Sequence, residues 1–177
     1  MNIFFGAVFI FSIILDQITK KWALLVLKNS SSIKIIDDFL RFSYVENRGA
    51  AFGILQNQII FFVIITIVMI TALGYIFFKN KNITKLTKLS LTLIAGGAIG
   101  NFIDRITLGY VVDFIDVRFG NFYDFPVFNL ADSFVVCGTF LLLILILTNK
   151  FEKSENSNEW YNLNCWLWKW KNWFIYY

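Results

Sequence analysis

The chain has 177 residues, of which 58% are hydrophobic and only 16% are charged, and its formal net charge is +4. An ordinary soluble domain is about 45–50% apolar and about 25% charged, so this composition excludes that class and indicates a membrane protein. The chain holds no histidine and only two cysteines, Cys137 and Cys165. This excludes histidine-based nucleophiles, histidine metal ligation and a thiolate zinc site, so any chemistry must rely on carboxylates.

Uncharged runs of sequence predict four membrane-spanning helices. They cover residues 1–15 with 22–27, 58–78, 89–103 and 133–149. A helix needs about 20 mostly apolar residues to cross the hydrocarbon core, a length that these runs reach with at most one flanking turn. The first run lacks Lys, Arg and a small-residue cleavage site, so we expect a retained helix rather than a signal peptide. In the third run, Gly96 and Gly100 form a small-xxx-small pattern that indicates close helix packing.

Lysines predict the orientation of these helices. Residues 79–88, between the second and third runs, hold four lysines and no acid, so the positive-inside rule places this loop in the cytoplasm. With an even number of spans, both termini are then cytoplasmic. Segments 28–57 and 106–130 face outward.

The two outer segments contain stretches that alternate apolar and polar residues. Residues 33–36, 39–45 and 111–118 show this period-2 pattern, which is typical of strands. We therefore expect an all-α membrane bundle of four transmembrane helices, with a small β-structure on its outer side, over residues 1–150. Residues 151–177 form a separate cytoplasmic tail, first polar and then Trp-rich. This tail suits the membrane interface, or is an extension without function.

Polar residues from separate parts of the chain gather at the outer ends of the predicted helices. Asp16 and Lys20 are spaced i, i+4 and share a helix face. Asn101, Asp104 and Arg105 share a face of the third helix. Charged groups near hydrocarbon are costly and are functional candidates by default. The structural alternative is that Asp16–Lys20 and Asp104–Arg105 are pairs that neutralise one another.

Asp113 and Asp132 lack an obvious basic partner nearby in the sequence. Taken singly, Asp132 could be a first-turn acid with Asn129 as its N-cap, and Asp113 a solvated loop acid. Together, at the mouth of a membrane bundle, they indicate an acid–base pair. Two carboxylates brought close share one proton, so the ionised one can deprotonate a water while the protonated one polarises a carbonyl. This chemistry hydrolyses a peptide without a covalent intermediate.

Five short segments form a pattern over about residues 1–150. They are residues 16–20 (DQITK), 46–53 (ENRGAAFG), 96–105 (GGAIGNFIDR), 109–116 (GYVVDFID) and 128–133 (FNLADS). With these five segments in this order, the chain resembles the lipoprotein signal peptidase family, the bacterial signal peptidase II. The resemblance implies four helices with an outer β-cradle, and an aspartyl endopeptidase that removes signal peptides from diacylglyceryl-modified prolipoproteins just before the lipidated cysteine. It also implies a site in the bacterial cytoplasmic membrane, with the active site toward the outer face.

By the same resemblance, Asp113 and Asp132 are the catalytic dyad. The family positions that hold the dyad and the substrate backbone correspond to Asp16, Lys20, Asn47, Asn101, Arg105 and Asn129. Asp104, Asp116 and Asp124 are not assigned catalytic roles. The Trp-rich tail has no counterpart in the family. No metal or cofactor is expected, and chelators should leave activity intact.

The expected partners are prolipoprotein substrates and membrane lipid, with no nucleic acid, and the enzyme is expected to be monomeric. Two alternatives are a small ion or proton transporter and a non-catalytic membrane scaffold. The transporter would relay ions through Asp16, Asp104 and Asp132. A relay needs polar groups throughout the membrane depth, whereas these crowd one end. The scaffold would tolerate both Asp113→Asn and Asp132→Asn.

Overall fold

The computed structural model of the protein describes residues 2–49, 55–120 and 122–153. Within them lie four long helices, which are α1 (Asn2–Val26), α2 (Ile59–Lys79), α3 (Lys85–Thr107) and α4 (Leu130–Leu147). Each is long enough and apolar enough to cross a membrane, which confirms the four predicted spans. The Trp-rich part of the tail lies outside the described residues.

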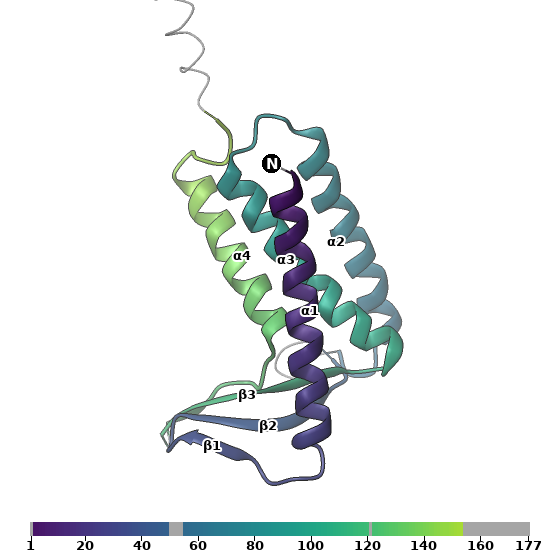
Figure 1. The fold of residues 1–177 in the computed structure, drawn as a ribbon, viewed down its shortest axis with the longest axis vertical. Helices are drawn as coiled ribbons and strands as arrows, with labels where there is room; N and C mark the ends of the chain where they lie inside the picture. The colour runs from purple at the N-terminus through teal and green to yellow at the C-terminus, as the bar shows by residue number, and fades with distance from the viewer. Residues whose placement is uncertain (1, 50–54, 121, 154–177) are drawn as a thin grey trace, which may run out of the picture.

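Helix α3 is the central helix of the bundle (Figure 1). It contacts α1, α2 and α4, and 56% of its most apolar stretch is buried, against 6% for α2. Because α2 packs on α3 and exposes most of its remaining surface, it has to be apolar all round to lie in a membrane, which explains its uninterrupted hydrophobic sequence.

Glycines of α3 allow α1 to approach it closely. A Cβ on Gly100 would lie 2.5 Å from Oδ2 of Asp16, and a Cβ on Gly96 would collide with the side chain of Ser12. The small-xxx-small pattern therefore lines the packing face, as the sequence predicts. The same contact brings the Asp16 carboxylate against α3.

A four-stranded antiparallel sheet joins the helices at one end. Its strands, in the order β1-β2-β3-β4, are β1 (Ile33–Ile36), β2 (Leu40–Asn47), β3 (Val111–Phe119) and β4 (Tyr123–Asp124). The first three confirm the strands predicted from alternation, whereas β4 has only two residues and is too short for a periodic signal. The register sets Val45 opposite Asp113, so Asn47 is a diagonal neighbour of Asp113 on the same face.

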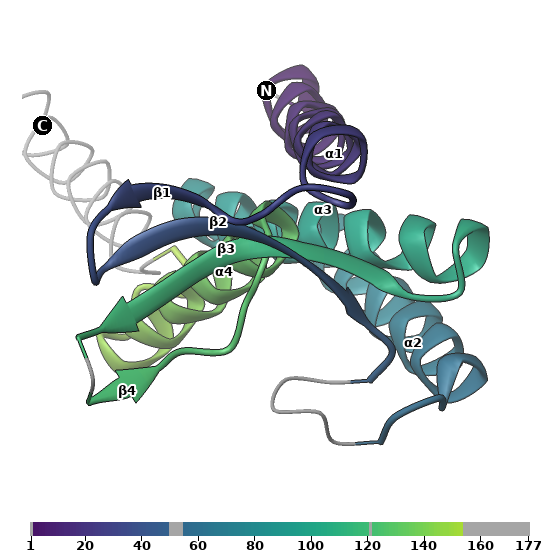
Figure 2. The same cartoon turned by 90° about the horizontal axis from the view of Figure 1, so that it is seen from below.

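The sheet lies across the end of the bundle where α1 and α3 end and α4 begins (Figure 1), which we call the sheet end. Figure 2 views this end directly and shows β2 and β3 running across it. A short turn with Gly109 at φ 79° leads from α3 into β3, and this left-handed conformation favours glycine. Strand β3 is thereby held between the ends of α3 and α4.

Apolar packing fixes the orientation of β3. Ala23 of α1 and Leu27, the residue that follows α1, are buried together with Val112 and Phe114 of β3 in one hydrophobic cluster. Successive side chains of a strand point to opposite faces, so Asp113, between these two apolar residues, faces away from the cluster.

The other end of the bundle is closed by the chain that leaves α4. The carbonyl of Phe151 accepts two hydrogen bonds there. One comes from the hydroxyl of Thr87 at 2.7 Å, and the other from the backbone N–H of Thr84, which is the N-cap of α3, at 3.1 Å. Residues 151–153 thus pack on the α2–α3 turn. The domain boundary at residue 150 stays a prediction.

Candidate functional site

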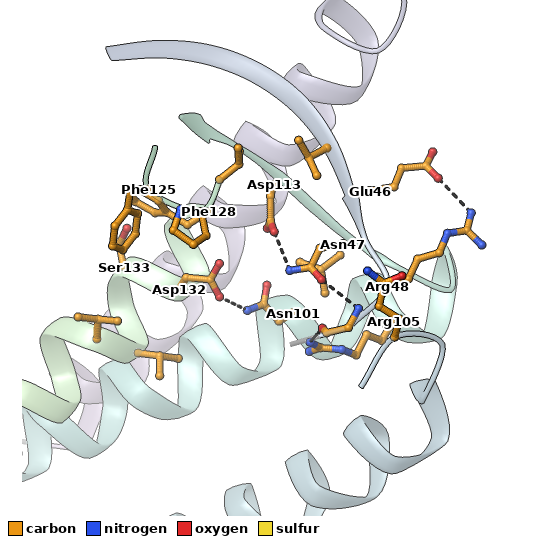
Figure 3. Close-up of a pocket in the computed structure, with 18 of the residues that line it drawn as sticks. Glu46, Asn47, Arg48, Asn101, Arg105, Asp113, Phe125, Phe128, Asp132 and Ser133 are labelled. Atoms are coloured by element: carbon orange, nitrogen blue, oxygen red, sulfur yellow. Dashed lines mark hydrogen bonds and ion pairs between the residues drawn. The ribbon is translucent and has the colours of Figure 1, made fainter. Parts of the chain in front are cut away.

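A pocket of about 710 Å³ lies at the sheet end, between the sheet, α3 and α4 (Figure 3). Five of the eight predicted site residues line it: Asn47, Asn101, Arg105, Asp113 and Asp132. The remaining predicted residues, Asp16, Lys20 and Asn129, are buried behind its polar side. The separate sequence segments that carry these residues therefore meet at one place.

Asp113 is the most enclosed of the pocket's acids. Its side chain is 1% exposed, and it accepts two side-chain amide hydrogen bonds, at 2.6 Å from Asn129 and at 2.9 Å from Asn47. These bonds use both carboxylate oxygens. The carboxyl group is thereby held in one orientation toward the pocket.

Asp132 lies in the first turn of α4 and is half-buried. Its Oδ1 accepts from the amide of Asn101 at 2.7 Å, and its Oδ2 accepts from the backbone N–H of Asn129 at 3.3 Å. Asn129 in turn accepts the backbone N–H of Asp132 at 2.9 Å, which completes a capping box. Asn129 is therefore the N-cap of α4, as predicted, and the first-turn acid Asp132 also lines the pocket.

Two asparagines connect the two acids. The amide of Asn129 donates to Asp113 at 2.6 Å and lies 3.1 Å from Oδ1 of Asn101, whose own amide donates to Asp132. A hydrogen-bonded chain thus runs from one carboxylate to the other. Such a chain restricts both side chains without neutralising either one.

The electrostatics of this arrangement favour a proton on the pair. The pKa of Asp113 is raised to about 7, first by burial and then by the nearby charge of Asp132, against the opposing effects of the hydrogen bonds from Asn47 and Asn129 and of the charge of Lys20. Two neighbouring carboxylates in a poorly solvated site ionise in separate steps. At neutral pH the pair can therefore hold one proton.

Arg105 is a pocket cation whose charge interacts with both acids of this pair. It lies over the ring of Phe62, 4.8 Å from the ring centre, and its Nη2 is 3.5 Å from the carbonyl of Gly49. At the rim, Arg48 donates to Glu46 at 3.0 Å, and this hydrogen bond lowers the pKa of Glu46. Among the described residues the guanidinium of Arg105 has one long hydrogen bond, so it could also bind a carbonyl oxygen of another molecule.

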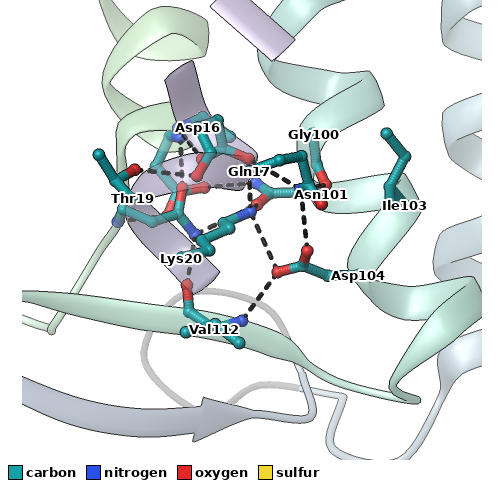
Figure 4. Close-up of polar contacts among 12 residues, drawn as sticks. Asp16, Gln17, Thr19, Lys20, Gly100, Asn101, Ile103, Asp104 and Val112 are labelled. Carbon is teal, nitrogen blue, oxygen red and sulfur yellow. Dashed lines mark hydrogen bonds and ion pairs between the residues drawn. The ribbon is translucent and has the colours of Figure 1, made fainter. Parts of the chain in front are cut away.

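Behind the pocket lies a buried ionic cluster (Figure 4). Lys20 lies 2.9 Å from Asp16 and 3.1 Å from Asp104, with all three side chains at most 4% exposed. Asp16 also accepts the backbone N–H of Ala131, and Asp104 accepts that of Val112. The cluster therefore ties α1 to α3, α4 and β3.

This cluster confirms one predicted ion pair and corrects the other. Asp16 and Lys20 are paired as their i, i+4 spacing predicts. The pairing of Asp104 with Arg105 is wrong, since Asp104 binds Lys20 while Arg105 points into the pocket. Adjacent residues of a helix point in different directions and do not face each other, which explains the difference.

Gln17 is a member of the cluster that the sequence analysis did not single out. Its amide lies 3.2, 3.1 and 3.0 Å from Asp16, the Gly100 carbonyl and Asp104, respectively. A neutral glutamine beside an acid carries no signal of its own in a single sequence. Its position within residues 16–20 is the one feature of the sequence that indicates a place for Gln17 in this cluster.

The other acids of the sheet lie in different surroundings. Asp116 is buried and accepts hydrogen bonds from Arg41 and Ser43, and Asp124 lies 3.5 Å from Arg118. Neither lines the pocket. Within the part of the chain that the structure describes, no group of three or more acids and cysteines could hold a metal ion.

The side of the pocket toward α4 is apolar. It is formed by Phe125 and Phe128 before α4 and by Val135 and Val136 on α4, and Val136 is 65% exposed on the outer surface of the bundle. The pocket thus combines carboxylates with a surface that an acyl chain or an apolar helix could contact.

Comparison with known protein families gives one match over most of the chain. A family model described as signal peptidase (SPase) II matches residues 8–148. A lipoprotein signal peptidase of Clostridium tetani (strain Massachusetts / E88) is 49% identical over 140 residues, which is 79% of this chain and 90% of that protein. A lipoprotein signal peptidase of Staphylococcus aureus (strain Newman) is 43% identical over 147 residues, covering 82% and 89%.

Two solved bacterial membrane enzymes have the same fold. One, solved at 2.3 Å resolution, has a TM-score of 0.77 and 41% identity, with 85% of this chain and 92% of that chain covered. The other, at 1.9 Å, has a TM-score of 0.73 and 42% identity, covering 81% and 92%.

Proposed function

Since the chain belongs to the signal peptidase II family, a family of aspartic peptidases, we propose that it removes signal peptides from diacylglyceryl-modified prolipoproteins with Asp113 and Asp132 as its catalytic dyad. Cleavage falls just before the lipidated cysteine. The observation that carries this proposal is the joining of the two carboxylates, in one pocket, through Asn101 and Asn129.

The pair can perform acid–base hydrolysis. One carboxylate takes a proton from a water, whose oxygen forms a bond to the scissile carbonyl carbon, and the other carboxyl gives its proton to the carbonyl oxygen. The tetrahedral diol then loses its C–N bond as a proton passes to the leaving nitrogen. The other carboxylate takes a proton from a hydroxyl of the diol, so the products are a carboxylic acid and an amine, and the dyad again holds one proton.

The remaining predicted residues position the substrate and the two carboxylates. Arg105, which has only one long hydrogen bond within the described residues, is suited to bind a substrate carbonyl oxygen. Asn47, Asn101 and Asn129 hold the two carboxylates, and the ionic cluster of Asp16 and Lys20 lies behind them.

The surroundings of the pocket fit a membrane-anchored substrate. The apolar side formed with α4 reaches the exposed surface at Val136, so acyl chains and an apolar signal helix can approach within the bilayer. The polar side lies at the helix ends, where water is available. The four lysines of residues 79–88 lie at the opposite end of the bundle, so the sheet end faces outward by the positive-inside rule and both termini are cytoplasmic.

A cleavage assay tests the proposal. The purified full-length protein, in detergent, is incubated with a diacylglyceryl-modified prolipoprotein, and the loss of the signal peptide is followed as a shift on a gel. We expect cleavage by the parent and by Asp124→Asn, an exposed-acid control, and loss of at least about a thousandfold for Asp113→Asn and for Asp132→Asn. Equal cleavage by all four, at matched folding, would contradict the dyad.

A further inference from the structure

Three asparagine side chains donate toward the two acids, and each is held in one orientation. Oδ1 of Asn47 accepts the backbone N–H of Gly49 at 3.0 Å, and Oδ1 of Asn129 accepts that of Asp132 at 2.9 Å. A backbone N–H can only donate, so the NH2 group of each amide must face the other way, toward Asp113.

The third amide, that of Asn101, is oriented by two side chains, since its Oδ1 accepts from the amide of Asn129 at 3.1 Å and from Lys20 at a shorter distance. Nζ of Lys20 donates to Oδ1 of Asn101 at 2.8 Å, and an ammonium group has no acceptor. The NH2 group of Asn101 therefore faces Asp132, at 2.7 Å. Because Lys20 is 3% exposed and is bound to Asp16 and Asp104, its ammonium has little freedom to leave this position (Figure 4).

We propose that Lys20 is a positioning residue which acts through Asn101 to keep Asp132 as the ionised member of the dyad, while Asp113 carries the shared proton. This inference rests on the proposed peptidase function. It assigns the water's proton to Asp132 and makes Asp113 the donor to the carbonyl oxygen.

The surroundings of the two acids agree with this assignment. Asp132 is half-buried, lies in the first turn of α4, where the helix dipole favours negative charge, and receives the Asn101 N–H. Asp113 is 1% exposed, and burial raises its pKa to about 7. The burial of Asp113 thus outweighs the two amide hydrogen bonds that it accepts.

The other charged groups around the pair come from two helices and from the end of β2. They are Lys20 and Asp16 of α1, Asp104 and Arg105 of α3, and the paired Glu46 and Arg48 at the rim of the pocket. Lys20 and its two acids form one buried cluster, and Arg105 contributes a positive charge felt by both dyad members. Lys20 is the member of this set that contacts an asparagine of the chain between the acids.

Loss of the ammonium would leave Oδ1 of Asn101 with only the longer contact, the one from the amide of Asn129, and would hold the Asn101 amide less firmly. The side chain could then turn over and present Oδ1 to Asp132, and two acceptors can share a hydrogen bond only if Asp132 is protonated. Asp132 would then bind a proton at higher pH and lose its capacity as a base.

The pH dependence of kcat/KM for prolipoprotein cleavage measures this effect. We expect Lys20→Met to move the acid limb of the profile upward by at least about one pH unit, and Lys20→Arg, which also only donates, to restore its position. The matched control is Lys21→Met, the same substitution at the exposed neighbouring residue, which should keep the parent profile.

A second set of variants separates positioning from folding. Lys20→Met leaves Asp16 and Asp104 without their cation, which can prevent folding. The double variant Lys20→Met/Asp104→Asn changes no net charge and should still show the upward shift, whereas Asp104→Asn alone should not. Gln17→Ala, which loosens the same cluster without touching Asn101, should lower the melting temperature and leave the acid limb in place.

The outcomes separate the two proposals. A folded parent that does not cleave would overturn the peptidase function together with this inference. A parent that cleaves and needs both acids, beside a folded Lys20→Met or double variant that is slower but has the parent's acid limb, would overturn the inference alone. Lys20 would then have a structural role only.

Discussion

Asn129 and Asp132 cap the first turn of α4 reciprocally, with hydrogen bonds of 2.9 Å and 3.3 Å in the two directions. Asn129 also donates to Asp113, and Asp132 is itself the second acid of the candidate dyad. Figure 3 shows Asp132 accepting from Asn101 in the pocket. One local motif therefore begins a helix and places a carboxylate in the pocket. The cap and the contact with Asp113 can be separated at this position.

Substitution of Asn129 should make that separation. Serine is as good an N-cap as asparagine but has no NH2 group. Asn129→Ser therefore keeps the cap but leaves Asp113 and the Val112 carbonyl without this donor, and it should lower the free energy of unfolding by about 1–3 kcal/mol and slow cleavage at least about tenfold. Asn129→Ala should lose about 1 kcal/mol more, through loss of the cap. Thermal unfolding in detergent and cleavage rates measure the two effects. A Ser variant with the parent's activity would show that the contact with Asp113 has no catalytic role.

The stability of the protein should depend on pH through Asp113. Its pKa is raised from 3.8 to about 7 in the folded state, so the folded protein resists ionisation of this group. The favourable contribution of the protonated form is fully present below pH 3.8 and is lost as the pH rises through about 7. The loss amounts to at most about 4 kcal/mol, for a shift of this size.

Melting temperatures in detergent between pH 5 and pH 8 would measure this dependence. We expect the parent to become less stable across this range and Asp113→Asn to show a smaller slope, because it has no group to ionise. Asp124→Asn, an exposed acid on β4, should keep the parent's slope. The same slope in all three proteins would contradict a raised pKa at Asp113.

Asp116 should act on stability alone. It is buried and accepts hydrogen bonds from Arg41 and Ser43 of β2, and it does not line the pocket. Asp116→Ala leaves those donors without their acceptor and should cost about 1–3 kcal/mol. Below its melting temperature, the variant should keep kcat within about twofold of the parent. A large fall in kcat at matched folding would place Asp116 in the catalytic machinery.

The sequence alone predicted the four helices, three of the four strands and the place where polar residues meet. These predictions succeeded because long apolar runs and period-2 alternation are local patterns, and because charged residues near hydrocarbon are few. The Asn129 cap and the Asp16–Lys20 pair are local too, and both are present.

What the sequence did not predict depends on contacts between distant segments. Asp104 pairs with Lys20 across two helices rather than with its neighbour Arg105, and Gln17 joins the same cluster. Likewise, the contact of Asn47 with Asp113 follows from a strand register that composition does not specify. Tertiary packing determines these contacts, and the helical or strand periodicity of a sequence does not predict them.

Gly100 should tolerate no side chain, because of the contact between α1 and α3. A Cβ there would lie 2.5 Å from Oδ2 of Asp16 and 3.2 Å from Cβ of Ala131. Gly100→Ala should therefore cost about 1–3 kcal/mol and, by displacing Asp16, also slow cleavage. Gly74→Ala on α2 is the matched control, since no atom lies within 4 Å of its Cβ, and it should be neutral or slightly stabilising. Equal melting temperatures for both variants would contradict the close packing of α1 on α3.

Val136 should control entry of the lipidated substrate rather than the chemical step. It lines the apolar side of the pocket on α4, is 65% exposed, and does not contact the dyad through any hydrogen bond. A bulky side chain there narrows the approach, so Val136→Trp should raise KM by about tenfold, which corresponds to about 1.4 kcal/mol, and leave kcat within about twofold.

The matched control for this substitution is Phe140→Trp. Phe140 lies one turn further along α4, is 63% exposed, and is not among the pocket residues, so its replacement should change neither constant. Steady-state kinetics with a lipid-modified prolipoprotein in mixed micelles would measure both constants. If Val136→Trp lowers kcat with KM unchanged, the residue acts on the transition state, and the substrate approaches the dyad from another side of the pocket.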